Sequence, residues 1–135
     1  MKNTAQITHS GQAAILLKAC ISTLDHEELW CLFLNQDNRL ISIEMVTKGS
    51  LDSTIIDART ILRRSLLNNA SKVLVAHNHP SGNPMPSHQD IEQTRKIRTV
   101  CDVLDIPLVD HIVLAKDNYF SFADETIQNY QPLNV

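Results

Sequence analysis

Two histidines and an aspartate stand at a spacing that suits a metal ion. His77 and His79 end an apolar, largely β-branched run that starts at Lys72, and Asp90 follows after a short loop. The run predicts a buried strand, and side chains two residues apart on a strand point to the same face. Both imidazoles can therefore reach one ion, and we predict a metal site with His77, His79 and Asp90 as its ligands.

The segment between the histidines and the aspartate supplies the necessary change of direction. Residues 80–86 are rich in proline and also contain serine, glycine and asparagine, a composition that forms turns and cannot continue a strand. Ser87 then begins a helix predicted to run to Leu104, and Asp90 lies in its first turn. Strand end, loop and helix start can thus bring the three side chains together.

The chemistry of such a site is hydrolytic. Catalytic zinc usually takes three histidine or carboxylate ligands and keeps a fourth position for water. Zinc lowers the pKa of that water from about 15.7 toward about 7, so a nearby group has to accept the proton. We predict Glu44 as this base, because it lies in an otherwise apolar and hydroxyl-bearing strand where an unpaired carboxylate is costly. An outward-facing strand residue explains Glu44 equally well, and Glu27 and Glu28 are weaker candidates.

Two further residues have a structural and a functional interpretation. Ser87 lies three residues before Asp90 on the same helix face, so its hydroxyl could donate to an oxyanion beside the metal. The same Ser-x-x-Asp spacing is typical of a capping box with Ser87 as N-cap, and the two roles can coexist. His111 starts a later strand after Asp110 and could orient a metal ligand, although simple packing explains it as well.

Strands alternate with helices along the rest of the chain. We therefore predict an α/β fold, a mixed β-sheet of about five or six strands flanked by helices in three layers. A single domain spans residues 1–135, with its core over about residues 27–124. Helices are predicted over residues 10–23, 57–69 and 87–104, and strands over residues 28–34, 40–48, 72–77, 110–115 and 119–122. The core-facing stripe of the longest helix is predicted to be Ile91, Thr94, Ile97, Cys101 and Leu104.

Composition excludes some functional classes and favours a compartment. Twelve basic and fifteen acidic residues give a net charge of −3, so the chain lacks the positive field that binding to a phosphate backbone usually needs. The three cysteines form no Cys-x-x-Cys pair, which favours reduced thiols in the cytoplasm. No apolar run is long enough for a signal peptide or a membrane span.

The spacing of these residues resembles a known motif. A glutamate, His-x-His, seven residues, a serine, two residues and an aspartate form the pattern of the JAMM (MPN+) metalloproteases, matched by Glu44, His77, His79, Ser87 and Asp90. The run His-Asn-His-Pro-Ser-Gly, with Lys-Gly-Ser-Leu upstream and Leu-Val-Asp-His-Ile downstream, more narrowly resembles the bacterial RadC family. This resemblance implies a fold related to that of cytidine deaminases. It also implies one Zn²⁺ on the two histidines and Asp90, Glu44 as general base and Ser87 assisting the oxyanion.

The leading interpretation is a zinc-dependent hydrolase, a metallopeptidase or isopeptidase that cleaves an amide bond in a peptide or protein. One alternative is a metal-dependent DNA-processing protein, a nuclease or a repair-associated factor in keeping with the history of the RadC family; the acidic balance of charge argues against it. A second alternative is a binding module that works without catalysis, against which the complete ligand set argues. A zinc deaminase is disfavoured because the Pro-Cys-x-x-Cys element is missing.

Overall fold

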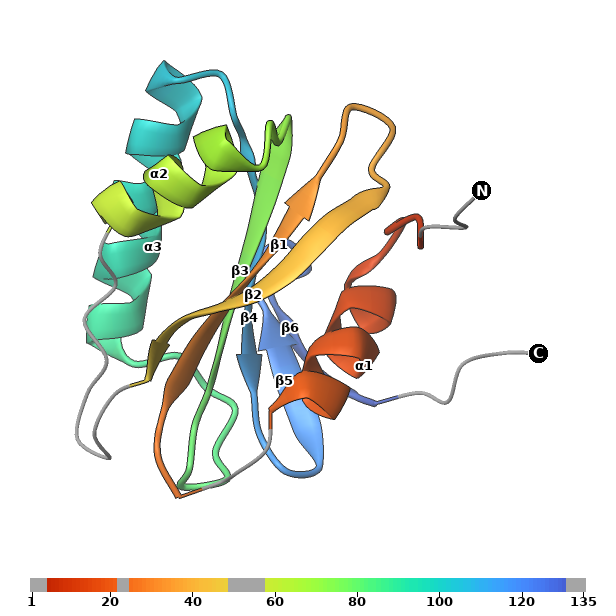
Figure 1. Ribbon diagram of the computed structural model, residues 1–135. Coiled ribbons are helices and arrows are strands. Elements are labelled where there is room, and N and C mark those ends of the chain that lie inside the picture. The colour runs from red at the N-terminus through yellow and green to blue at the C-terminus, as the bar shows by residue number, and fades with distance from the viewer. Residues whose placement is uncertain (1–4, 22–24, 49–57, 131–135) are drawn as a thin grey trace.

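The computed structural model describes residues 5–21, 25–48 and 58–130, and a six-stranded mixed sheet forms their centre. The strands lie in the order β2-β1-β3-β4-β5-β6, with β3 and β4 parallel and every other neighbouring pair antiparallel. Figure 1 shows the twist of this sheet. The strands are β1 (Glu28–Leu34), β2 (Leu40–Lys48), β3 (Lys72–Asn78), β4 (Leu108–Leu114), β5 (Asn118–Ser121) and β6 (Thr126–Asn129).

The hairpin of β1 and β2 is built by its turn residues. The Asn35 side-chain oxygen accepts the backbone N–H groups of Asp37 and Arg39 at 2.8 and 2.9 Å, and Asn38 has a φ of 60°, a conformation that asparagine tolerates well. β1 does not end the sheet, because its other edge pairs with β3 from Leu29 opposite His77 to Leu34 opposite Lys72. β1 therefore separates β2 from the strand that carries the histidines.

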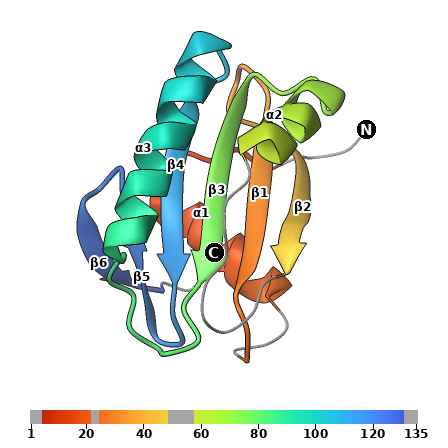
Figure 2. The ribbon, with the colours of Figure 1, turned by 90° about the vertical axis from the view of Figure 1, so that its left-hand side faces the viewer.

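Helices cover both faces of the sheet, as a three-layer fold requires. α1 (Ser10–Cys20) packs on one face, and α2 (Ala58–Leu67) and α3 (His88–Val103) pack on the other. Figure 2 views the molecule from the side of α2 and α3, with α1 behind the strands. Each face has its own apolar cluster, so β1 and β3 are buried on both sides and read as continuous apolar runs. The predicted α/β class and three layers are confirmed.

Several predicted boundaries move by one to three residues. β3 extends to Asn78, β4 begins at Leu108, and α3 starts after Ser87, which is its N-cap. α1 ends at Cys20; residues 22 and 23, and the predicted helix start at residue 57, lie outside the described residues. The strand β6 was not predicted, because residues 126–135 show no clear periodicity in the sequence.

The predicted core stripe of α3 is wrong at two positions. Ile91 and Leu104 are 39% and 44% exposed. The buried residues of the helix are Asp90, Thr94, Ile97 and Cys101, which share one face. Asp90 is charged, so apolar spacing selects its neighbour Ile91 in its place.

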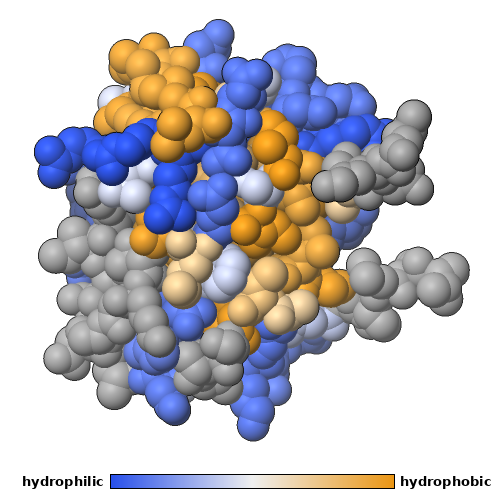
Figure 3. Space-filling model, in the orientation of Figure 1, coloured by the Kyte–Doolittle hydropathy of each residue, from blue (hydrophilic) through white to orange (hydrophobic). Residues whose placement is uncertain are grey.

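The surface carries apolar side chains in two areas. Figure 3 shows one over α2 and the end of α3, at the upper left, and another around β2 and α1, near the centre. Large exposed apolar side chains on these elements are Leu66, Leu67, Val103, Ile41 and Met45. Within the described part of the chain, no helix combines the length and apolar character needed to cross a membrane.

Candidate metal centre

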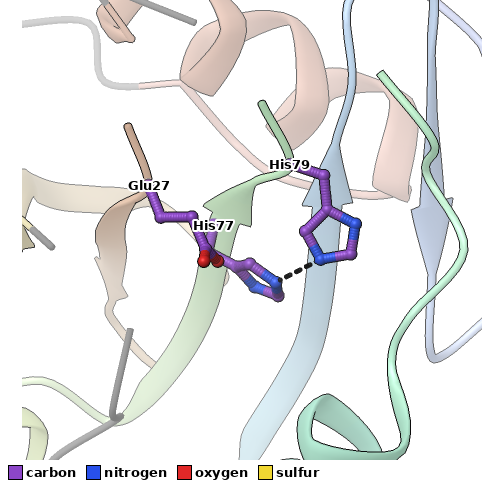
Figure 4. Close-up of side chains that lie close together, drawn as sticks. All are labelled: Glu27, His77 and His79. Carbon is purple, nitrogen blue, oxygen red and sulfur yellow. Dashed lines mark hydrogen bonds between the residues drawn. The ribbon is translucent and has the colours of Figure 1, made fainter. Parts of the chain in front are cut away.

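The end of β3 places two imidazoles on the face that α3 covers. His77 pairs with Leu29 of β1 on one side and with Val113 of β4 on the other, so its backbone is fixed from both edges. The His79 N–H donates to the Leu114 carbonyl at 2.8 Å and continues this register beyond the strand. Figure 4 shows both rings directed into the same space from the end of β3.

Asp90 reaches that space because it belongs to a capping box. The Ser87 N–H donates to Asp90 Oδ2 at 2.8 Å, and the Asp90 N–H donates to Ser87 Oγ at 3.0 Å. These reciprocal bonds satisfy two backbone donors at the start of α3 and fix the direction of the carboxylate. The structure thus brings His77, His79 and Asp90 together, as their spacing predicted.

The three side chains form a small triangle of potential ligand atoms. The two Nε2 atoms are 3.1 Å apart, His79 Nε2 lies 3.0 Å from Asp90 Oδ2, and His77 Nε2 lies 3.3 Å from Asp90 Oδ1. Ligands bound at 2.0–2.1 Å to a tetrahedral zinc ion are separated by about 3.3–3.4 Å. The triangle therefore matches the dimensions of a zinc site closely.

The outer nitrogen of His79 is held by the loop that follows it. Gly82 has a φ of 86°, which glycine adopts without strain, and its N–H donates to the His79 carbonyl at 3.1 Å. This turn returns the Asn83 carbonyl to 2.8 Å from His79 Nδ1. A carbonyl can only accept, so Nδ1 carries the hydrogen, and the neutral ring presents a bare Nε2 to the site.

The outer nitrogen of His77 is held by a buried chain of polar groups. His77 Nδ1 lies 2.8 Å from His111 Nε2, and His111 Nδ1 is hydrogen-bonded to Thr94 Oγ1. The Thr94 hydroxyl donates to the Asp90 carbonyl at 2.7 Å, so the His111 Nδ1–H donates to Thr94. His111 then accepts from His77 Nδ1–H, which leaves His77 Nε2 bare as well. Burial, and secondarily His77, lowers the pKa of His111 well below its ordinary value and keeps it neutral.

Three acceptors facing one another need a positive charge between them. Although burial opposes the change, the facing imidazoles of His77 and His79 hold the pKa of Asp90 far below its ordinary value. Burial also opposes charge on His79, yet its contacts with Asp90 and the Asn83 carbonyl raise the pKa of His79. The donor set therefore fits a divalent cation, and His77, His79 and Asp90 are the residues that would hold it.

Glu27 is the acidic neighbour of this triangle. It lies immediately before β1, and its carboxylate oxygen and the ligand atoms of His77 and His79 all lie within 4.8 Å of one another. Figure 4 shows the Glu27 side chain directed toward the histidines from just before the adjacent strand β1. Burial raises the pKa of Glu27, and the two histidines partly offset that rise. The Asp90 carboxylate lies closer to the histidine nitrogens than the Glu27 carboxylate does. Asp90 is therefore the better candidate for the third metal ligand, and Glu27 lies beside the ligands.

Glu44 does not lie with this group. It lies on β2 opposite Cys31 of β1. Its carboxylate accepts hydrogen bonds from Ser42, Asn68 and Arg64 at 2.9, 2.8 and 3.2 Å. These bonds outweigh the effect of burial and lower the pKa of Glu44. The carboxylate predicted as the base is therefore part of the junction between β2 and α2.

Glu28 points to the opposite face from Glu27. Its carboxylate accepts from Trp30 Nε1 at 3.0 Å and from His26 Nε2 at 3.2 Å, and only 3% of the residue is exposed. Adjacent glutamates at a strand start give no sign in the sequence of which one faces the site. Asn78 and the polar role of Thr94 were not predicted. The available signal was a threonine four residues after Asp90, on the same helix face.

The sequence matches one described protein family over most of its length. The family model described as "RadC-like JAB domain" matches residues 7–127. A "UPF0758 protein" of Flavobacterium johnsoniae is 40% identical over 122 residues, which cover 90% of this chain and 53% of the relative. A "UPF0758 protein" of Porphyromonas gingivalis is 38% identical over 126 residues, covering 93% and 56%.

The chain spans about half the length of the curated relatives it matches. The matched region nevertheless includes strands β1 to β5, the first two residues of β6 and every residue of the candidate metal centre. The chain therefore belongs to the RadC-like JAB domain family, which has a fold of the metal-dependent hydrolase type.

Proposed function

We propose that this protein is a zinc-dependent hydrolase that cleaves an amide bond in a peptide or protein. The observation that carries the proposal is that two imidazole nitrogens and the Asp90 carboxylate approach one another to 3.0–3.3 Å, and that their outer hydrogen-bond partners direct them at one point. A zinc ion held there would acidify a water molecule and polarise the carbonyl of the substrate. The carboxylate of Glu27 beside this point supplies the base that such chemistry needs.

Glu27, rather than Glu44, takes the role of general base in this proposal. Its carboxylate accepts a proton from the attacking water and later returns it to the departing amine, so the proton balance closes at one group. Burial raises the pKa of Glu27, which brings it closer to neutral pH and suits a group that must both accept and release a proton. Glu44 is already occupied by Arg64 and Asn68.

Ser87 is proposed to stabilise the oxyanion. Its Oγ accepts the Asp90 N–H, which uses a lone pair and leaves the hydroxyl hydrogen free to donate to the substrate oxygen. The Ser87 residue is exposed, so an incoming carbonyl can reach it. The capping and catalytic roles of Ser87 are thereby compatible.

A zinc assay combined with a peptide-library cleavage screen tests the proposal. The parent protein should bind one zinc ion and cleave a responsive peptide, and His77→Ala should lose both properties. Glu27→Gln should keep zinc and lower kcat by about 10²–10⁴-fold. Glu44→Gln is the matched control and should cleave at close to the parental rate.

Two results would contradict the proposal in different ways. A purified parent that binds no zinc under metal-replete conditions would remove the basis of the hydrolase function. Loss of cleavage in Glu44→Gln together with full activity in Glu27→Gln would return the role of base to Glu44.

A further inference from the structure

The β1–β3 ladder is extended by a side chain at the edge of the candidate site. Backbone pairing in this direction ends with Leu29 opposite His77. One step further, the Glu28 N–H donates to Asn78 Oδ1 at 2.6 Å, and Asn78 Nδ2 donates to the His26 carbonyl at 3.0 Å. The Asn78 amide thus pairs with β1 as a peptide group would.

These two bonds enclose Glu27. They fix the backbone on both sides of this residue, at the carbonyl before it and at the N–H after it, while its carboxylate faces the histidines. Asn78 is 1% exposed, so water does not compete for its amide. Asn78 lies between His77 and His79 in the chain, and its side chain points to the opposite face from their rings. Its two hydrogen bonds therefore link the backbone around Glu27 to the backbone between the two histidines.

We propose that Asn78 is a positioning residue, which holds Glu27 at the distance from His77 and His79 that proton transfer requires. This inference rests on the proposed function, in which Glu27 is the base. The regular pairing of β1 starts at Glu28, one residue after the base, so the ladder of β1 does not itself hold Glu27. A displacement of about 1 Å at a reacting group can lower a rate by about 10²-fold, which gives the restraint its catalytic importance.

The chemistry of the asparagine side chain explains its presence between the histidines. An amide offers a donor and an acceptor at once, and both are used. Asn78→Asp keeps an acceptor for the Glu28 N–H and loses the donor to the His26 carbonyl. Asn78→Ala loses both bonds, so the two variants form a graded series at one position.

Steady-state kinetics on the full chain test the proposal. Asn78→Ala should lower kcat by about 10–100-fold with KM and zinc affinity unchanged, and Asn78→Asp should lower it less. On a Glu27→Gln background, Asn78→Ala should cause no further loss, because a positioning residue acts through the group it positions. Asn35→Ala is the matched control, because the Asn35 side chain also forms hydrogen bonds to backbone groups, but at the turn between β1 and β2.

Crystal structures of the parent and of both Asn78 variants give a measurement independent of activity. In the variants, the Glu27 carboxylate should leave its place within 4.8 Å of the histidine ligand atoms. An unmoved carboxylate, or a loss of kcat that adds to that of Glu27→Gln, would overturn the proposal. A parent without hydrolytic activity would instead refute the proposed function, and the crystal structures would still decide what Asn78 holds in place. If Asn78→Ala does not fold, Asn78→Asp carries the same comparison.

Discussion

Asp90 links the beginning of a helix to the candidate metal centre. Its carboxylate accepts the Ser87 N–H and also faces His77 and His79. The cap needs only an acceptor oxygen, whereas a cation needs the negative charge. Substitutions at these two positions can therefore separate the stability of α3 from metal binding.

We expect Asp90→Asn to bind zinc much more weakly while keeping most of its stability. The amide oxygen can still accept the Ser87 N–H, but the charge is lost. Removing a hydrogen-bond partner of a metal ligand typically lowers metal affinity by about 10–100-fold. Asp90→Asn alters a ligand itself, so its loss of zinc affinity should be larger. Ser87→Ala should behave in the opposite way, losing about 1 kcal/mol of stability with zinc affinity largely kept. Calorimetric titration and chemical denaturation of both variants measure the two effects, and equal zinc affinity in Asp90→Asn and the parent would contradict this assignment.

His111 and Thr94 set the protonation pattern of His77, although neither touches the predicted ion. We expect His111→Ala to lower zinc affinity by about 10–100-fold, because His77 loses the acceptor that keeps its Nε2 bare. Thr94→Val, which preserves the shape of the side chain, should lower affinity in the same direction by a smaller factor. Competition with a chromogenic chelator gives both values. Unchanged affinity in His111→Ala would assign this histidine to packing alone.

The order of the strands decides which glutamate approaches the histidines. Local periodicity predicted the β1–β2 hairpin and the position of His77 and His79, since both depend on neighbouring residues. It could not predict that β1 inserts between β2 and β3, because this pairing joins segments about 40 residues apart. That insertion brings Glu27 to the histidines and leaves Glu44 on the outer strand. The metal ligands, which local spacing fixes, were predictable, whereas the choice between Glu27 and Glu44, which long-range pairing fixes, was not.

The junction of β2 and α2 provides a prediction for stability against pH. The pKa of Glu44 is lowered in the folded protein from 4.5, so its contribution to stability is present above about pH 4.5 and is lost as the pH falls through the lower folded-state value. Because the Arg64–Glu44 pair is partly exposed, we expect Glu44→Gln to cost only about 0.5–1 kcal/mol at neutral pH. Urea denaturation at about pH 7 and about pH 3 should show this difference shrinking on acidification. A difference that grows as the pH falls would contradict the assigned direction.

The candidate centre joins distant parts of the whole molecule. Glu27 precedes β1, the two histidines end β3, Asp90 begins α3, and His111 lies on β4. Unfolding separates these segments. A cation that binds only the folded chain therefore shifts the folding equilibrium toward the folded state. The stability of the entire domain should therefore depend on free zinc.

We expect zinc at a free concentration about 100-fold above its Kd to stabilise the fold by about 2.7 kcal/mol. This gain should appear as a rise of several degrees in Tm, and a chelator should reverse it. The zinc-dependent rise should vanish in His77→Ala, which serves as the control. An equal rise in that variant would indicate that zinc acts elsewhere on the chain.

The rigidity of the ligand triangle has a consequence for the choice among cations. The Asn83 carbonyl, His111 and the capping box hold the donors in place before any ion arrives. Ca²⁺ needs six to eight oxygen ligands at about 2.3–2.6 Å, and Mg²⁺ requires near-octahedral oxygen coordination. A fixed gap of 3.0–3.3 Å between two nitrogens and a carboxylate satisfies neither ion. We therefore expect the centre to discriminate against Ca²⁺ and Mg²⁺, and this selectivity would depend on a histidine tautomer and a helix cap.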